Sequence, residues 1–559
     1  MKVNPGENLF LVVVLTTLAG LFYFLAPPGL ASNEEGVHYV QMKNFALNGS
    51  LEIQSPGFGL GFEAKDLGGR RGFFESRDDR LYATPPPLFP WVASLFFPVF
   101  GERTVDFTPI LFLFLSALVL GLVLDRVMKR DVLYWLLLAL FLAGCPVFLQ
   151  GLIFSGMSLA LLLITSALWL MVIHLTGNPS AARLFGASVL MGASALARME
   201  CLPMAFSFWL CATLVLVMQR RMKELLTVLA GCAFSLAVLV FHDVLLHGRF
   251  PGPYLQLLLP FHALSPIRLA ALGGALSLSL GLIVLSQRED AIGPVRRAVL
   301  LILSVIFAFG AVLLTAARFT VSHLMAFFPA VLFVFYGVPG RVERLRKGEG
   351  TLEGILAGSV VLCLVLGAVV LRTGSWIVFS VWLPMVSFVI LLIALEQKVV
   401  FAARGMYIVL AFFCGVAFVN GIEESRERIL KYREYNAAYV AFLAGHTSAG
   451  DVVLFEDAGN MDHSGPLFFD RVFLVAKSPG DAERFARLLG EKGVDRLYAW
   501  TVNPLHIKGV NPYGEFPPTF PFPLGSKSCC GGSCKERNYY LVRLDTRAIF
   551  SPGASREGS

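Results

Sequence analysis

Apolar segments long enough to cross a bilayer recur along most of the chain, and this recurrence limits the fold more than any other feature. A transmembrane helix needs about 20 predominantly apolar residues, and about thirteen such segments are present. Hydrophobic residues make up 56% of the 559 positions and charged residues only 15%. The sequence therefore predicts a polytopic α-helical membrane protein. The expected spans are 9–30, 108–127, 132–151, 156–175, 182–198, 201–218, 224–246, 265–286, 298–316, 319–338, 353–371, 375–395 and 403–420.

Lysine and arginine gather in alternate segments between these spans. If every span is real, these clusters share one side of the membrane, which the positive-inside rule makes cytoplasmic. The long polar stretch after the first span and the C-terminal region then lie outside. We therefore expect a multi-pass protein of the cytoplasmic (inner) membrane. The basic residues are Arg126, Lys129, Arg130, Arg183, Arg220, Arg221, Lys223, Arg288, Arg296, Arg297, Arg341, Arg344, Arg346, Lys347, Lys398 and Arg404.

The first apolar segment has an alternative interpretation as a cleaved signal peptide. The residues from Leu25 to Ser32 resemble a cleavage region. However, Lys2 is almost the whole of the positive n-region, and the apolar run is long for a signal peptide. A retained transmembrane helix is the interpretation that we prefer.

The chain changes character from about Glu423 onward. A charged, helical stem begins there, followed by a short apolar strand at 452–455, a helical pattern at 481–490 and further strands at 495–500 and 539–542. Alternating short strands and helices favour a small α/β domain. We expect two domains: a transmembrane domain at 1–421, which includes a large first external loop at 31–107, and an extracytoplasmic α/β domain at 422–559.

The nine cysteines fall into two groups. Six lie in apolar segments, where cysteine behaves as a small hydrophobic residue. The other three, Cys529, Cys530 and Cys534, cluster near the C-terminus. In an oxidising compartment, Cys529 or Cys530 with Cys534 could close a disulfide, which leaves one thiol whose role the sequence does not indicate.

The polar stretch from about Ala31 to Gly101 is where we expect chemistry. The acidic pair Glu34-Glu35 follows the first span by a few residues, and His38-Tyr39 comes directly after it. A carboxylate positioned at the membrane surface can act as a general base toward a hydroxyl group while a lipid-linked donor stays in the bilayer. The alternative is that both glutamates are solvated charges at the start of a loop.

Several motifs of this stretch together resemble the first external loop of the GT-C membrane glycosyltransferases, most closely the family-39-like enzymes. These include the protein O-mannosyltransferases and the lipid A aminoarabinose transferase. The sequence departs from that pattern in having Glu34 where the family often has Asp, and Thr84 where a Lys often precedes the prolines. The matching positions are Glu34-Glu35, His38-Tyr39, Tyr82, Pro85-Pro86-Pro87-Leu88, Trp91 and Phe100-Gly101.

The resemblance implies a GT-C-like fold and an inverting transfer of one sugar from a polyprenyl-phosphate donor to an acceptor hydroxyl at the outer face. Glu34 or Glu35 would be the catalytic base. Arginine suits the leaving phosphate because its guanidinium binds two oxygens, and Arg318 and then Arg198 are the preferred candidates. For any single arginine, snorkelling to the lipid headgroups is the alternative. The substrate-binding candidates are His38, Tyr39, Tyr82, Arg198, Glu200, Tyr254, Arg318 and His323.

Asp78 and Asp79 precede Tyr82 in the same stretch. A type I turn with Asp at its start is the interpretation that we slightly prefer. The alternative is a divalent cation, Mg²⁺ or Mn²⁺, held by Glu34 with Asp78 or Asp79, since hard cations take oxygen ligands.

Two other functions compete with glycosyl transfer: a lipid-linked glycan flippase or transporter, and a non-catalytic membrane scaffold. The spans carry almost no charge at their centres, whereas ion-coupled transporters usually need charges there. No Walker A motif is present. The net charge of +7 sits in short loops, so nucleic acid is not an expected partner. The expected partners are membrane lipids, the donor lipid and an acceptor that the sequence leaves open between protein, lipid and glycan.

Overall fold

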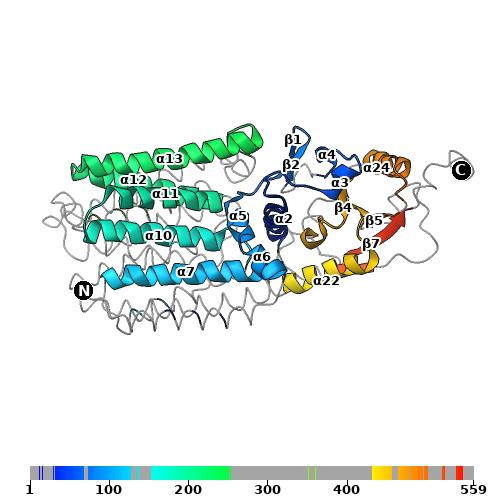
Figure 1. The fold of residues 1–559 in the computed structure, drawn as a ribbon, viewed down its shortest axis with the longest axis horizontal. Coiled ribbons are helices and arrows are strands. Elements are labelled where there is room, and N and C mark those ends of the chain that lie inside the picture. Colours follow the sequence, from blue (N-terminus) through cyan, green and yellow to red (C-terminus); the bar gives the residue numbers. More distant parts are fainter. Residues whose placement is uncertain are drawn as a thin grey trace, which may run out of the picture. The chain divides into compact units, whose positions relative to one another are not determined.

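The computed structural model describes part of the chain in two compact units. Unit 1 comprises Met1–Ala26 and Asp106–Glu427, and unit 2 comprises Pro27–Val105 and Arg428–Ser559 (Figure 1). The described residues are 29–30, 32–67, 74–127, 153–250, 431–455, 464–476, 479–494, 496–501, 519–522 and 537–544, with single positions at 12, 16, 20, 134, 138, 252, 351, 355 and 359.

The described part of unit 1 consists of long apolar helices (Figure 1). They are α7 (Thr104–Val127, in this unit from Asp106), α10 (Met157–Thr176), α11 (Ala181–Ala197), α12 (Leu202–Met218) and α13 (Met222–His247). Helix α11 packs against α10, α12 and α13. Four described stretches are long and apolar enough to cross a membrane: Phe97–Arg126, Met157–Thr176, Met199–Met218 and Met222–His247.

Five of the predicted spans are confirmed as helices, with ends within a few residues of the prediction. These are the spans predicted at 108–127, 156–175, 182–198, 201–218 and 224–246. The span at 201–218 corresponds to α12 and is preceded by the short 3₁₀ turn η2 (Met199–Cys201). The remaining spans, and with them the predicted total of about thirteen, fall outside the described residues except at isolated positions.

Small residues let α11 and α13 approach closely. A Cβ atom at Gly192 would lie 2.3 Å from Ser235 Oγ, and one at Gly231 would lie 2.6 Å from Ser188 Cβ. The Ser188 hydroxyl donates to the Val228 carbonyl across the same contact at 3.1 Å. This is the packing expected where helices associate in lipid, because small side chains permit backbone approach and hydroxyl groups bond between helices.

One face of α13 exposes large apolar side chains. Leu226 is 64% exposed, Phe241 67% and Leu245 56%. Such a stripe is unfavourable in water but suits contact with lipid acyl chains.

The first part of unit 2 is mostly helical. The helix α2 (Asn33–Asn48) begins at the N-cap Ser32 and ends at Gly49, whose φ of 61° is the left-handed conformation that glycine adopts readily at a helix end. It is followed by α3 (Pro56–Gly59), α4 (Ala64–Leu67), the strands β1 (Phe74–Arg77) and β2 (Arg80–Ala83), and then α5 (Leu88–Ser94), α6 (Phe97–Phe100) and η1 (Gly101–Arg103).

The apolar run at 88–100, which is too short to span a bilayer, is divided between α5 and α6. Its exposed side chains include Trp91 at 50%, Leu95 at 62% and Val99 at 77%. Exposed apolar side chains of this kind are typical of helices that lie at a membrane interface.

The second part of unit 2 contains a five-stranded sheet in the order β4-β3-β5-β7-β6. Strand β3 lies parallel to both β4 and β5, and β7 runs antiparallel to both β5 and β6. The predicted strand at 452–455 is confirmed as β3, and the predicted helix at 481–490 as α24. The elements are α22 (Lys431–His446), β3 (Val452–Phe455), η4 (Gly465–Leu467), β4 (Val472–Val475), α24 (Pro479–Glu491), β5 (Leu497–Thr501), β6 (Thr519–Phe522) and β7 (Arg537–Leu544).

Burial explains these elements. All four residues of β3 are buried, as expected of a central strand between two parallel neighbours. In α24 the buried residues Phe485, Ala486 and Leu489 recur at helical spacing, while Arg484 faces solvent at 42% side-chain exposure.

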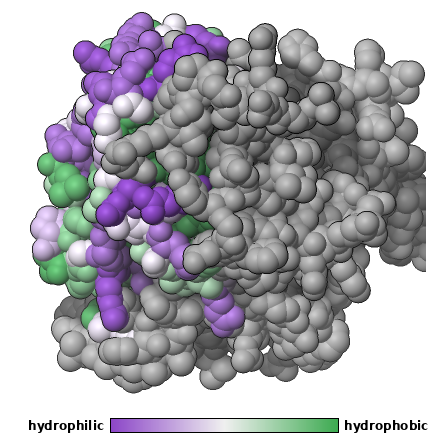
Figure 2. Space-filling view, turned by 90° about the vertical axis from the view of Figure 1, so that its right-hand side faces the viewer, coloured by the Kyte–Doolittle hydropathy of each residue, from purple (hydrophilic) through white to green (hydrophobic). Residues whose placement is uncertain are grey.

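In Figure 2, which shows one end of the molecule, hydrophilic residues cover much of the coloured surface, with smaller hydrophobic areas among them.

The two parts of unit 2 pack on each other through aromatic rings and glycines. Phe74 stacks on Phe468 with ring centroids 5.7 Å apart, and Phe62 meets the edge of Phe485 at the same distance. A Cβ atom on Gly465 would lie 2.8 Å from the Gly36 carbonyl oxygen. Residues that are 394 to 429 positions apart in the chain thus share one core.

Candidate functional site

The N-terminal turn of α2 holds both glutamates of the predicted acidic pair, in different environments. The Ser32 hydroxyl accepts the Glu35 backbone N–H at 3.3 Å and donates to the Glu35 carboxylate at 3.4 Å. This Ser-x-x-Glu arrangement is related to the helix capping box, and Glu35 is completely buried. Glu34, by contrast, keeps a side-chain exposure of 22%. Only Glu34 therefore presents its carboxylate toward the surface.

Glu34 heads a chain of polar contacts along α2. Its Oε1 lies 3.5 Å from His38 Nε2, one helical turn away. His38 Nδ1 lies 3.3 Å from Gln41 Oε1, and Gln41 Nε2 donates to the Pro85 carbonyl at 3.1 Å. The imidazole is buried and meets the edge of Phe89 at 5.6 Å. The proline-rich segment thus orients Gln41, which orients His38.

The orientation of Gln41 decides where the His38 hydrogens lie. Because the amide nitrogen donates to Pro85, its oxygen faces His38 Nδ1, and an oxygen can only accept, so Nδ1 carries a hydrogen. The other nitrogen, Nε2, faces the Glu34 carboxylate. An imidazole and a carboxylate in contact can accept and pass on a proton, which is the property required of a general base.

Tyr39 lies in a separate cluster with Lys43 and Glu102. Its hydroxyl donates to Glu102, and Lys43 Nζ bonds both the Tyr39 oxygen at 3.2 Å and Glu102 at 3.1 Å. The pKa of Tyr39 is raised, first by burial and then by the bond to Glu102. This cluster joins α2 to η1.

Tyr82, Asp78 and Asp79 lie in the β1–β2 hairpin. Tyr82 is half-buried opposite Glu75 and bonds Arg80, whose pKa is raised first by this bond and then by the charge of Glu52. Asp78 and Asp79 form the two-residue turn with φ of 50° and 58°. The predicted type I turn is therefore wrong, because two positive φ values are the mark of a type I′ hairpin, whose twist matches that of the strands.

The metal alternative finds no support in this hairpin. Asp79 Oδ1 accepts the Ala64 backbone N–H at 3.2 Å. Within the described ranges, no group of three or more His, Cys, Asp or Glu side chains could hold a metal ion.

In unit 1, Arg198 and Glu200 form an ion pair at the break between α11 and α12. Arg198 has extended backbone angles that end α11, and its Nη2 donates to Glu200 Oε1 at 3.0 Å. Their side chains are 12% and 6% exposed. The interrupted helix thus carries a mostly buried guanidinium, which suits recognition of an anion.

The end of α13 carries a second ionisable cluster. Asp243 lies 3.1 Å from His242 Nδ1 and accepts the Gly252 backbone N–H at 2.7 Å. This contact ties Gly252, five residues beyond the end of α13, back to that helix. Three predicted binding residues, Tyr254, Arg318 and His323, lie outside the described residues, as do the C-terminal cysteines.

Sequence reasoning did not single out Ser32, Gln41, Lys43 or Glu102. The Ser32-x-x-Glu35 spacing is a readable capping signal, and Gln41 follows His38 by the i, i+3 spacing of one helix face. Glu102 lies 63 positions from Tyr39, and no local pattern connects them.

No protein-family model matches this sequence, and no curated protein matches it. Solved structures do resemble it. The oligosaccharyltransferase of Archaeoglobus fulgidus, tethered to an acceptor peptide with the NVT sequon, is 13% identical, with a TM-score of 0.50 over 98% of this chain and 77% of that chain.

This likeness decides the fold. The chain has the fold of the GT-C membrane glycosyltransferases. ArnT from Cupriavidus metallidurans bound to undecaprenyl phosphate is also similar, at 12% identity over 95% of this chain and 97% of that one, with a TM-score of 0.46. A complex of the Archaeoglobus oligosaccharyltransferase with Zn and sulfate is similar at 14% identity over 97% and 76% of the two chains, with a TM-score of 0.49. The predicted fold resemblance is confirmed.

Proposed function

We propose that this GT-C protein transfers a sugar from a polyprenyl-phosphate donor to an acceptor hydroxyl at the outer face of the cytoplasmic membrane. The observation that carries the proposal is the contrast within the acidic pair. Glu35 is buried and bonded to the helix cap, while Glu34 is partly exposed and paired with His38. Glu34 is therefore our candidate for the catalytic base, and Glu35 for a structural role.

In the proposed reaction, the acceptor oxygen attacks the anomeric carbon as its proton passes to the Glu34 carboxylate. The bond between the anomeric carbon and the phosphate oxygen breaks, and polyprenyl phosphate leaves. A single displacement of this kind inverts the anomeric configuration. His38 acts as a positioning residue, because it holds the carboxylate in place and is itself held by Gln41.

The donor phosphate needs cationic partners, for which we propose Arg198 and Arg318. Arg198 is held in an ion pair with Glu200 at 3.0 Å, so its guanidinium is already oriented before an anion arrives. The similar ArnT structure contains undecaprenyl phosphate, which supports this class of donor. Tyr39, Tyr82, Tyr254 and His323 remain proposed substrate-binding residues.

The test is sugar transfer by the purified protein in lipid, with radiolabelled polyprenyl-phosphate sugars and a crude envelope fraction as acceptor. Glu34→Gln is expected to reduce the transfer rate by a factor of about 10² or more, with unchanged donor binding. Glu35→Gln is the matched control, expected to transfer sugar at a near-normal rate per folded molecule. It should lose about 1 kcal/mol of stability, because the cap is weakened.

Two outcomes would contradict the assignment. Normal transfer by Glu34→Gln would remove Glu34 as the base. Export of the intact lipid-linked sugar without any transfer, in a reconstituted vesicle assay with a competent acceptor, would favour a flippase instead.

A further inference from the structure

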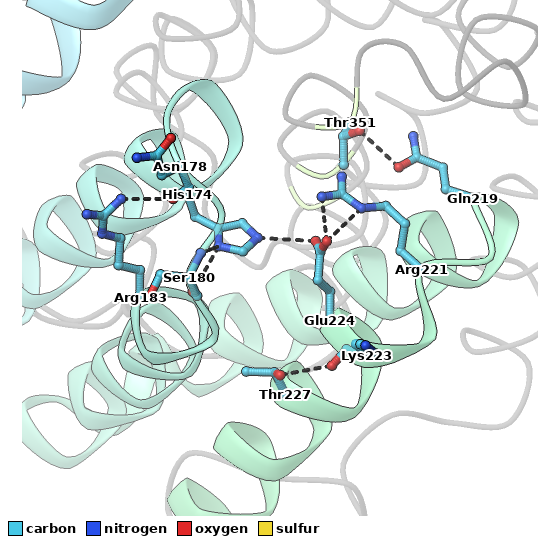
Figure 3. A network of polar contacts seen from close by, with 10 residues as sticks. All are labelled: His174, Asn178, Ser180, Arg183, Gln219, Arg221, Lys223, Glu224, Thr227 and Thr351. Atoms are coloured by element: carbon cyan, nitrogen blue, oxygen red, sulfur yellow. Dashed lines mark hydrogen bonds and ion pairs between the residues drawn. The ribbon is translucent and has the colours of Figure 1, made fainter.

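A network of polar contacts joins the end of α10 to the beginnings of α11 and α13 (Figure 3). His174, whose side chain is 1% exposed, lies 3.2 Å from Glu224 Oε2. Arg221 donates from Nε and Nη2 to the other carboxylate oxygen, at 2.9 and 2.5 Å. Ser180 lies against the second imidazole nitrogen. The Glu224 carboxylate is therefore fully engaged by Arg221 and His174.

This engagement leaves positive charge in excess at the same end of the helices. Glu224 is the single carboxylate in segments 174–183 and 219–227, which also contain four arginines and lysines. Lys223 and Arg220 are exposed. Arg183 is half-buried, and its Nη1 donates a hydrogen bond to the Asn178 backbone carbonyl at 3.0 Å (Figure 3). None of these three cations is paired with Glu224.

A shallow groove of about 420 Å³ runs between α11 and α13 beside these cations. Phe185 and Leu226 in its walls are 37% and 64% exposed. The lining residues are Ala181, Ala182, Phe185, Leu226, Thr227 and Ala230.

The position of Lys223 links the charge to the groove. Leu226, Thr227 and Ala230 follow it by three, four and seven residues, so all four side chains share one face of α13. The one polar side chain of the lining, Thr227, donates its hydroxyl to the Lys223 carbonyl at 2.9 Å. An occupant must therefore be apolar along the groove and anionic at the end near Lys223.

We propose that this groove binds an anionic glycerophospholipid, with one acyl chain against the apolar walls and the phosphate near Lys223 and Arg183. The neighbouring face of α13 exposes apolar side chains that suit lipid, so acyl chains reach the groove from the bilayer. Basic pockets between transmembrane helices are recognised sites for anionic headgroups. The proposal concerns a lipid site separate from the acidic pair, and it holds whether or not Glu34 is a base.

The test is native mass spectrometry of the full-length protein, released from mixed micelles with equal amounts of dioleoyl phosphatidylglycerol and dioleoyl phosphatidylcholine. The wild type is expected to retain phosphatidylglycerol preferentially. Lys223→Gln should weaken this retention about fivefold. Arg126→Gln, the same loss of charge at an exposed position near the end of α7, is the matched control and should leave retention unchanged.

A second variant separates the groove from the charge. Ala230→Leu should narrow the groove and reduce retention of both lipids while the cations remain. The proposal is overturned if the two lipids are retained equally by the wild type, or if Lys223→Gln and Arg126→Gln have equal effects. A preference for undecaprenyl phosphate over phosphatidylglycerol would also overturn it, because the occupant would then be a donor-type lipid. Far-ultraviolet circular dichroism confirms that each variant is folded.

Discussion

Asp66 and Arg484, which are 418 positions apart in the chain, form an ion pair in unit 2. The Asp66 side chain is 3% exposed and that of Arg484 is 42% exposed. The Asp66 carboxylate also accepts the Glu63 backbone N–H at 3.2 Å, and the pKa of Arg484 is raised first by its bond to Asp66. The pair connects α4 of the first polar stretch to α24 beside the C-terminal sheet.

Removing the two partners of this pair should have unequal costs. Arg484→Gln leaves a buried carboxylate without its cation and is expected to lower the free energy of unfolding by about 2–3 kcal/mol. Asp66→Asn leaves a guanidinium that water can reach, so its cost should be about 1 kcal/mol or less. Both losses of stability can be measured by unfolding the purified protein in urea and using limited proteolysis to detect the unfolding of unit 2. Equal losses would contradict the asymmetry.

Gly465 is expected to tolerate no side chain. A Cβ atom there would lie 2.8 Å from the Gly36 carbonyl oxygen, and neither backbone can move without disturbing α2 or η4. Gly465→Ala should therefore cost about 1–3 kcal/mol. Gly445→Ala is the control within the same unit, since nothing lies within 4 Å of its Cβ position and it belongs to a helix. That control should be neutral or stabilising by up to about 1 kcal/mol. Thermal unfolding compares the two variants.

Tyr39 should make unit 2 sensitive to alkaline pH. Its pKa is raised above the ordinary value of 10.0, so above pH 10 the unfolded chain loses a proton that the folded protein keeps. Stability from this group is complete below pH 10 and falls above it, by up to about 1.4 kcal/mol per pH unit. Tyr39→Phe should remove this component of the slope, while Tyr82→Phe serves as the control. Unfolding measured at several pH values between 9 and 11 would contradict the prediction if Tyr39→Phe kept the full slope.

Arg198 and Glu200 allow a structural role to be separated from a role in donor binding. Arg198→Gln alone leaves the Glu200 carboxylate, 6% exposed, without this cation, and should destabilise unit 1 by about 3–5 kcal/mol. The double variant Arg198→Gln/Glu200→Gln removes both charges and should recover most of that stability. If Arg198 binds the donor phosphate, the double variant should bind radiolabelled polyprenyl phosphate more weakly than the wild type does, even though it is folded. Wild-type binding by the double variant would assign the pair to folding alone.

Much of the fold is predictable from local sequence patterns. The apolar segments of α7, α10, α11, α12 and α13 are visible because lipid demands about 20 apolar residues in succession. The strand β3 and the helix α24 are visible because their apolar residues follow the period of a buried strand and of a helix.

The candidate site was predictable only in part. The sequence marked Glu34, Glu35 and His38 as a group, and α2 does bring Glu34 and His38 together, because they are one helical turn apart. It did not separate the two glutamates, because the burial of Glu35 depends on the neighbours that cover α2.

By itself, the sequence determined the class of protein, which is a chain of membrane-spanning helices with a polar stretch and a mixed α/β region. Each of these parts can be recognised from its amino-acid composition and from the spacing of its apolar residues. Only the tertiary structure decided that Tyr39 bonds Glu102, that Asp66 bonds Arg484, and that the first polar stretch shares a core with the C-terminal region. Such pairings join positions tens to hundreds of residues apart. No local pattern records them, because they depend on which buried surfaces fit together once the helices and strands have formed.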